Sequence, residues 1–283
     1  MPLLVEGRTD IEVLVHDDST DDNVEAAMNE LAASHSFLRY SRNVPAKGAV
    51  GNWNGLLQHA QGRYVILIHH DDFPLSETFA SDLMAALEKN DWPDAVILSC
   101  LAYNAGRRKI KPCICNPIRS FIAKRTPFYL FRRNVIGPPS VLVVRRELFE
   151  GYDPGLKWLV DVEAYFRFLA SKTRRLFFSR LIMVSSTGLP SAISTSIRNN
   201  IEEITEAELA YIETKYPEMK SRSMSSFPRA AYALSEKIVW AMIRTSSLLC
   251  RIIMRPPTYA EVMRREQSSL EVDHPQEKTI DAA

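Results

Sequence analysis

Two adjacent carboxylates, Asp71 and Asp72, directly follow an apolar run at residues 64–68. Adjacent carboxylates repel one another, and a divalent cation or arginine partners offset that repulsion most easily. Mg²⁺ or Mn²⁺ is commonly held by one or two carboxylates together with substrate phosphates. The same pair is also an ordinary turn sequence that needs no ligand. Taken alone, the two residues leave a cation site and a plain turn both open.

Further acidic residues begin a loop and a helix elsewhere in the chain. Asp17 and Asp18 follow a second apolar run and open a cluster of turn-forming residues. Asp161 stands at the start of a helical pattern, where a carboxylate either serves as a general base or simply opposes the helix dipole. Glu163 points to another side of that helix, so it is expected to orient a loop or an acceptor and is the second candidate base. Arg167 is expected to pair with one of these acids.

The histidines and cysteines give no strong metal signal. His69 and His70 precede the acidic pair and are interpreted as strand-end residues. A zinc site made of these histidines with Cys113 and Cys115 is rejected, because the chain has no paired Cys-x-x-Cys spacing. Four cysteines in a chain of 283 residues do not make a disulfide framework. A reducing compartment is therefore expected.

Charge and composition exclude several classes of protein. Lysine and arginine total 35 against 34 aspartate and glutamate residues, so the net charge of +1 leaves no excess to bind a nucleic-acid backbone. Hydrophobic residues make up 46% and charged residues 24%, which is typical of a folded globular chain. Neither a secretory signal nor an apolar run of about 18 residues is visible, so no membrane span is expected.

Hydrophobic periodicity predicts an alternation of strands and helices. Expected strands lie at residues 11–15, 64–68, 95–98, 140–144 and 176–184, and expected helices at 24–31, 50–60, 79–87 and 160–169. This order favours an α/β fold with a doubly wound, mostly parallel, Rossmann-like sheet, whose ligands bind beyond the carboxyl ends of the strands. The run at 64–68 has no polar face and is predicted to be a central parallel strand. Residues 103–139 have poor periodicity and are predicted to form a long active-site loop.

Three blocks of residues, in order along the chain, resemble the family 2 glycosyltransferases, which have the GT-A fold. The first, at residues 15–21, is similar to the Asp-Asp-Gly-Ser-Thr-Asp-like loop of that family. The second, at residues 48–72, has an Asn-x-Gly-like turn at Asn54 and leads to the acidic pair. The third, at residues 139–167, contains the helix start with Asp161. The resemblance covers roughly residues 11–190.

The resemblance implies an inverting, metal-dependent transfer of sugar from a nucleotide-diphosphate sugar to a hydroxyl acceptor. It implies Asp161 as the general base and Asp72 as the ligand of Mg²⁺ or Mn²⁺, with Asp71 beside it. The residues implied for binding the nucleotide sugar are Asp17, Asp18, Asn54 and Asp71. Chemistry agrees with these roles, because the leaving diphosphate must be neutralised and the attacking hydroxyl must lose its proton.

A bacterial setting is also implied by the resemblance. The expected donor is a UDP-sugar, the expected acceptor is a saccharide or a lipid-linked saccharide, and the expected process is assembly of a surface polysaccharide or glycolipid. The protein is expected in the cytoplasm, with a possible peripheral place at the inner face of the cell membrane. Nucleic acid is not an expected partner.

The chain is expected to divide into a catalytic domain at residues 1–200, a helical extension at 201–255 and a mobile tail at 256–283. In the extension, basic residues at 237–255 share one helix face beside a broad apolar face. Such a helix either docks on an anionic membrane surface or packs its apolar face on the catalytic domain, and the sequence leaves both open.

The chain departs from the family pattern at its beginning. Family members open with an additional strand and helix, whereas only ten residues precede Ile11, so that unit is expected to be missing. Two other functions therefore stay open. One is a truncated, non-catalytic paralogue that acts as a binding or membrane-associated module. The other is a nucleotidyltransferase, although such enzymes normally carry a Gly-rich phosphate loop, which is not visible here.

Overall fold

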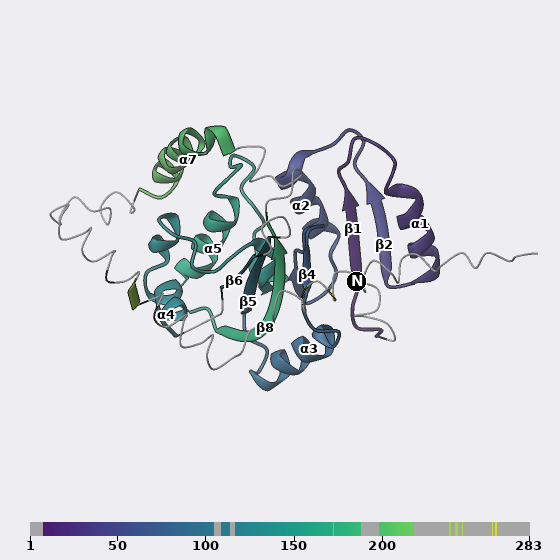
Figure 1. The fold of residues 1–283 in the computed structure, drawn as a ribbon, viewed down its shortest axis with the longest axis horizontal. Helices are drawn as coiled ribbons and strands as arrows, with labels where there is room; N and C mark the ends of the chain where they lie inside the picture. The colour runs from purple at the N-terminus through teal and green to yellow at the C-terminus, as the bar shows by residue number, and fades with distance from the viewer. Residues whose placement is uncertain are drawn as a thin grey trace, which may run out of the picture.

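The computed structural model describes residues 8–104, 109–113, 117–171, 173–187 and 198–217, with the single positions 238, 241, 242, 245, 262 and 264. Within these ranges, strands and helices follow one another along most of the chain (Figure 1). Among the described residues, no helix is both long enough and apolar enough to cross a bilayer.

The N-terminal part forms a small parallel sheet with two helices. Strands β1 (Val13–Asp17) and β2 (Leu38–Arg42) pair in parallel and are connected by α1 (Glu25–Ser34). Helix α2 (Gly48–His59) follows and packs against β1. The Glu12 carboxylate accepts hydrogen bonds from two backbone N–H groups in the loop after α2. The start of β1 is thereby attached to the beginning of the larger sheet.

The larger sheet has six strands of mixed direction. Five of them lie in the order β3 (Tyr64–Ile66), β7 (Leu142–Arg145), β5 (Ala95–Asn104), β8 (Leu176–Ser186) and β4 (Asp72–Pro74), and β6 (Lys109–Cys113) pairs with β5. Only β5 and β8 run in parallel among these described strands. Nearly every residue of β5 is buried, so this strand is at the centre of the core.

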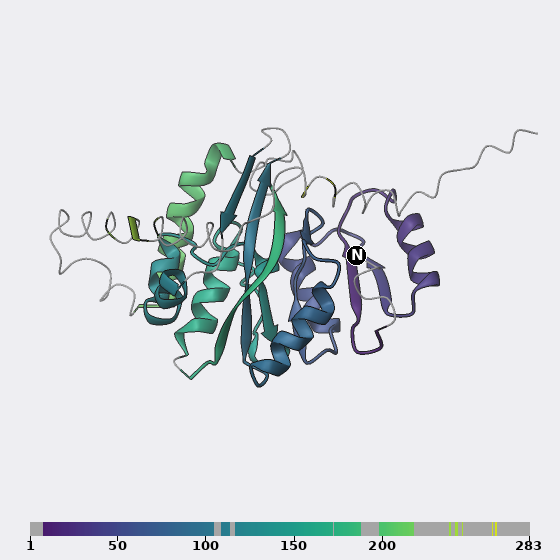
Figure 2. The same ribbon diagram turned by 60° about the horizontal axis from the view of Figure 1, so that its bottom comes forward.

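Helices cover both faces of the larger sheet (Figure 2). On one side lie α4 (Pro117–Arg125), α5 (Val160–Ala170) and α7 (Ile201–Lys215), and on the other lie α3 (Phe79–Lys89) and α2. Short 3₁₀ turns occupy Pro127–Phe131, Pro139–Val141, Arg146–Leu148 and Arg198–Asn200. Eight of the eleven residues of α5 are buried, which makes it the most enclosed of these helices.

The expected α/β class is confirmed, but two expectations about the sheet are wrong. Strand β3 was expected at the centre of a mostly parallel sheet, whereas it pairs antiparallel to β7 at one end of the strand order. An apolar run reports that a strand is covered by other residues and does not report the direction of its neighbour. The stretch at 103–139 is not one long loop either, because it contains β6, α4 and a 3₁₀ turn.

The C-terminal part is described at fewer positions. Helix α7 packs on α5, with Ile212 fully buried in the main core, so the boundary expected at residue 200 stays a prediction. Val262 is buried beside Leu101 of β5 and Val184 of β8. The helix expected at 237–255 and the tail expected at 256–283 lie mostly outside the described residues, and membrane docking stays a prediction.

The loop that leads to α5 yields a prediction for Gly151→Ala. Gly151 has a φ of +83°, and a Cβ there would stand 2.7 Å from Asn54 Oδ1. Two hydrogen bonds with the backbone of Tyr152 hold Asn54 in place. We expect the variant to lose about 1–3 kcal/mol of unfolding free energy in urea titrations. Gly48→Ala is the control, since Gly48 has a φ of +75° but open space around it. Equal losses in both variants would contradict a cost from the Asn54 contact.

Candidate active site

Asp161 lies in the first turn of α5 and is half-buried. The side-chain amide of Asn134 donates a hydrogen bond to Asp161 Oδ2 at 2.8 Å. Asn134 is itself fixed, because its Oδ1 accepts from the backbone N–H groups of Ile136 and Gly137. Burial raises the pKa of Asp161 to about 7, and hydrogen bonds from the backbone N–H groups of Val162 and Asp161 and from Asn134 offset only part of that effect. A carboxyl group with this pKa can accept a proton near neutral pH, as a general base must.

Two buried tyrosines lie close enough to Asp161 for its charge to act on them. Burial raises the pKa of both Tyr152 and Tyr165, and the charge of Asp161 raises each further. The Tyr165 hydroxyl donates to the carbonyl oxygen of Pro138 at 2.7 Å. Both phenols therefore stay protonated at physiological pH.

A second group consists of His69, Asp71 and Asp72. Each side chain offers one ligand atom, and these atoms lie within 4.8 Å of one another. The Asp72 side chain is only 1% exposed, and its Oδ2 has no hydrogen-bond partner among the described residues. The same is true of His69 Nε2. The His69 ring stacks on Trp53 with centroids 4.8 Å apart, which fixes the orientation of the imidazole.

The charges of this group suit a divalent cation. Burial lowers the pKa of His69 and raises the pKa of Asp72, so both side chains favour their neutral forms in the protein alone. A neutral imidazole is the form that binds metal ions, and a buried carboxyl group is stabilised in its charged form by a nearby positive charge. The two unpartnered buried atoms therefore fit a cation site. His69, interpreted from the sequence as a strand-end residue, belongs to the group.

Contacts connect the two groups of residues. The Trp53 ring touches His69 on one side and Tyr152 on the other, at a centroid distance of 5.3 Å. The charges of Asp161 and Asp72 both raise the pKa of Tyr165. The structure therefore brings the expected base and the expected acidic pair into one neighbourhood.

Asp17 and Asp18 hold the loop after β1. Asp18 accepts hydrogen bonds from the backbone N–H groups of Lys47 at 2.7 Å and Gly48 at 2.8 Å, at the start of α2. Asp17 accepts from the backbone N–H of Ser19 and from the Tyr40 hydroxyl, both at 2.9 Å. Burial raises the pKa of Asp17, but these bonds bring it below its usual value. Binding of a nucleoside by either residue stays a prediction.

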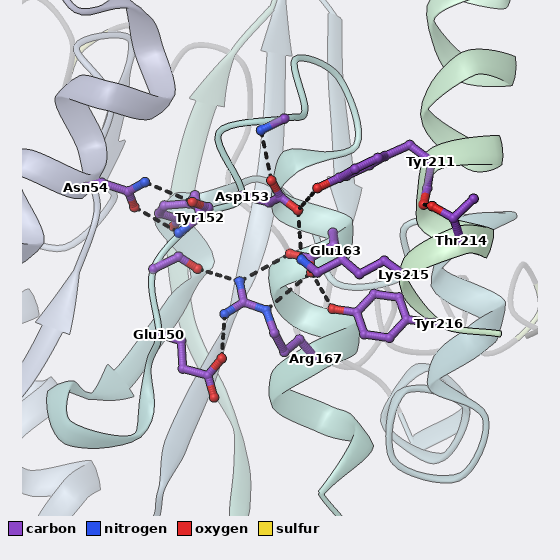
Figure 3. Close-up of polar contacts among 12 residues, drawn as sticks. Asn54, Glu150, Tyr152, Asp153, Glu163, Arg167, Tyr211, Thr214, Lys215 and Tyr216 are labelled. Atoms are coloured by element: carbon purple, nitrogen blue, oxygen red, sulfur yellow. Dashed lines mark hydrogen bonds and ion pairs between the residues drawn. The ribbon is translucent and has the colours of Figure 1, made fainter. Parts of the chain in front are cut away.

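Asn54 joins α2 to the loop that precedes α5. Its amide donates to the carbonyl oxygen of Tyr152, and its Oδ1 accepts from the Tyr152 N–H, both at 2.8 Å. Its expected contact with the nucleotide sugar, like that of Asp71, stays a prediction. The expected pairing of Arg167 is confirmed, because Arg167 bonds to Glu163 (Figure 3).

Sequence reasoning did not single out Asn134 or Tyr152. Asn134 lies in the stretch of poor periodicity, where only its spacing from Gly137 marks a turn. Gly137 has a φ of +135°, which glycine adopts far more easily than other residues do. The signal available in the sequence was therefore an Asn-x-x-Gly turn at residues 134–137, with an acidic helix start further along the chain.

Comparison with known proteins now decides the family. The model of "Glycosyl transferase family 2" matches residues 3–153, over half of the chain. The chain belongs to glycosyl transferase family 2. The match ends before Asp161, so it does not include the expected base of this glycosyltransferase. No curated protein matches the chain.

Solved structures with similar folds include other glycosyltransferases. S. aureus TarS 1-349 in complex with UDP is 17% identical, with a TM-score of 0.48, and the match covers 64% of this chain and 52% of TarS 1-349. The mannosyltransferase PcManGT from Pyrobaculum calidifontis, in complex with GDP-Man and Mn²⁺, is 16% identical, with a TM-score of 0.45, and the match covers 83% and 73% of the two chains. This glycosyltransferase thus spans about half the length of the TarS chain.

The raised pKa of Asp161 predicts a pH-dependent effect of Asp161→Asn on stability. The pKa is about 7 in the folded protein and about 3.9 in an unfolded chain. The folded state thus holds the proton more tightly, and this stabilisation is fully present below the unfolded pKa and lost as pH rises through about 7. Asparagine does not ionise, so the variant should gain stability relative to wild type between pH 4 and 8, on the order of a few kcal/mol.

Urea unfolding of both proteins at pH 4, 6 and 8 measures this difference. Glu147→Gln removes an exposed carboxylate and serves as the control for general charge effects. A stability difference between Asp161→Asn and wild type that stays constant over this range would show that Asp161 has an ordinary pKa.

Proposed function

We propose that this glycosyltransferase moves a sugar from a nucleotide-diphosphate sugar to a hydroxyl acceptor, with inversion at the anomeric carbon. The observation that supports this most directly is the placement of a carboxyl group with a pKa of about 7, Asp161, beside the group of His69, Asp71 and Asp72. In the reaction, the acceptor oxygen bonds to the anomeric carbon while the bond from that carbon to the diphosphate breaks. The nucleoside diphosphate leaves with the bonding electron pair.

Asp161 is proposed as the general base. Its carboxylate takes the proton of the acceptor hydroxyl as that oxygen attacks, and the pKa of about 7 makes this transfer effective near neutral pH. Asn134 donates to one carboxylate oxygen and fixes the direction of the carboxyl group. Glu163 is a weaker candidate, because it is fully buried and already bound to Arg167 and Lys215.

The group of His69, Asp71 and Asp72 is proposed to hold Mg²⁺ or Mn²⁺. Asp72 and Asp71 are the proposed carboxylate ligands, and His69 is the proposed third ligand. A cation there would neutralise charge on the leaving diphosphate. The nucleotide-sugar contacts proposed for this chain are those of Asp17, Asp18, Asn54 and Asp71. Asp18 bonds to the backbone at the start of α2, where Lys47 adds a positive charge.

The proposed donor is a UDP-sugar, and the proposed acceptor is a saccharide or a lipid-linked saccharide of a bacterial surface polysaccharide or glycolipid. The family membership supports a sugar-transfer role, and the resemblance of the sequence blocks supports this setting. A cytoplasmic place near the membrane is part of the same proposal.

Asp161→Asn tests the sugar transfer. We expect UDP binding close to that of wild type and a loss of transfer of about 10²–10⁴-fold, because only the proton acceptor is removed. The assay incubates each protein with labelled UDP-α-sugars, Mn²⁺ and a panel of saccharide acceptors, and NMR determines the anomeric configuration of the product. A β-linked product supports inversion. An α-linked product, or an active Asp161→Asn variant, would contradict the proposal.

Asp72→Ala tests the cation site. Calorimetric titration of wild type with Mn²⁺ and UDP should show joint binding, and the variant should bind Mn²⁺ at least about tenfold more weakly, since a ligand oxygen is lost. Asp82→Ala, which removes an exposed carboxylate of α3, is the matched control and should titrate like wild type. Identical titrations of wild type and Asp72→Ala would mean that Asp72 holds no cation.

A further inference from the structure

Helix α7 reaches the start of α5 through one buried carboxylate. Glu208 is 6% exposed, and its two oxygens accept hydrogen bonds from three consecutive backbone N–H groups. The donors are Lys157 at 2.6 Å, Trp158 at 3.1 and 3.2 Å, and Leu159 at 2.7 Å. Such charge-assisted bonds to backbone N–H groups are stronger than those between neutral groups.

These three donors lead directly into the helix that carries Asp161. The first N–H groups of a helix, counted from the N-cap residue, have no acceptor within the helix, and the N–H groups of Lys157 and Trp158 lie just before that residue. Leu159 occupies the N-cap position of α5 and has no side-chain oxygen. Glu208 supplies the oxygens from a helix 49 to 51 residues further along the chain. Asp161 is the second residue of α5, so the backbone that Glu208 holds is the backbone that places Asp161.

Other side chains at the C-terminal end of α7 bond to Asp153 and Glu163, which precede and follow Asp161 in the sequence (Figure 3). Lys215 Nζ donates to Asp153 Oδ2 and to Glu163 Oε1, at 2.7 Å each. The Tyr211 hydroxyl donates to Asp153 Oδ2 at 3.0 Å. The segment at 153–163 is therefore attached to α7 before α5, at the N-cap of α5 and within its first turn.

We propose that Glu208 is a positioning residue for Asp161, which rests on the proposed function, where Asp161 takes the acceptor proton. Glu208 fixes the backbone at 157–159 and so sets the position from which the Asp161 carboxyl group meets Asn134. It acts through the backbone of α5 and does not touch the reacting atoms. Helix α7 then supports the start of α5 through Glu208 and is not a separate extension.

Glu208→Gln tests this role, because glutamine has the same shape but replaces one accepting oxygen by an NH₂ group. We expect kcat to fall about ten- to a hundredfold, since a shift of about 1 Å at a reacting group has an effect of this size. The donor KM should stay within about twofold of wild type, because the donor contacts are unchanged. Glu206→Gln, at an exposed position of α7, is the matched control and should behave like wild type.

A second measurement needs no turnover. The carboxyl carbon of Asp161 is titrated by ¹³C NMR in wild type, Glu208→Gln and Glu206→Gln. The groups that act on the Asp161 carboxyl are Asn134, Tyr152, Tyr165 and the backbone N–H groups of Asp161 and Val162, and none of these residues is substituted in the variants. A displaced Asp161 gains water and its pKa falls below the value of about 7, whereas a role of Glu208 in stability alone leaves that pKa unchanged.

The outcomes separate the two proposals. A folded Glu208→Gln variant with wild-type kcat and an unchanged Asp161 titration would overturn the positioning role. If wild type transfers no sugar, the proposed function fails, while the titration still decides the role of Glu208. Should Glu208→Gln fail to fold, Glu208→Asp takes its place, since it keeps the charge and shortens the reach. The same fall in the Asp161 pKa is expected for it, and no fall would overturn the proposal.

Discussion

Asp161 and Glu163 stand two residues apart at the start of α5, and their surroundings move their pKa values in opposite directions. Burial raises both, yet only Glu163 has cationic and phenolic partners, which bring its pKa below the usual value. Asp161 has only uncharged donors, the backbone N–H groups of Val162 and Asp161 and the amide of Asn134, so its pKa remains raised. A helix turn that carries one fully charged and one partly protonated carboxyl group needs both environments to be built separately. Pairs of this kind commonly mark a division of roles in an active site.

The charged member of the pair constrains the rest of the fold. Glu163 is fully buried, and Arg167, Lys215 and Tyr216 surround it with donors (Figure 3). A buried carboxylate that loses a partner typically costs about 3–5 kcal/mol, whereas the intact cluster adds little net stability. This cluster is therefore better explained by the arrangement it enforces than by the stability it adds. The cluster holds α7 against α5. The same contact places Glu208 next to the backbone that precedes Asp161.

The sequence predicted the elements whose burial is strongly periodic and missed those defined by distant partners. Helix α5 and strand β5 were found because their apolar residues follow one clear pattern. The three-residue strand β4 was missed, since its pairing with β8 depends on residues more than a hundred positions away. The surroundings of His69 were not predicted for the same reason. Nothing in its local sequence shows that Trp53 stacks on it or that its Nε2 is buried. Asp71 and Asp72 were singled out by their position after an apolar run and Asp161 by its position at a helix start, and the family resemblance then implied their roles.

The two halves of the candidate site are built on different layers of the molecule, so the packing between those layers sets the distance between them. Asp72 lies on β4, a strand of the larger sheet that pairs with β8. Asp161 lies on α5, in the helix layer that covers one face of this sheet together with α7. Loop residues 134–141 cross from one half to the other, since Asn134 bonds to Asp161 and the Ser140 hydroxyl lowers the pKa of Asp72. Protein cores are close-packed and transmit small displacements. The buried side chains of α5, Phe166 among them, therefore help to set how far the base stands from the acidic pair.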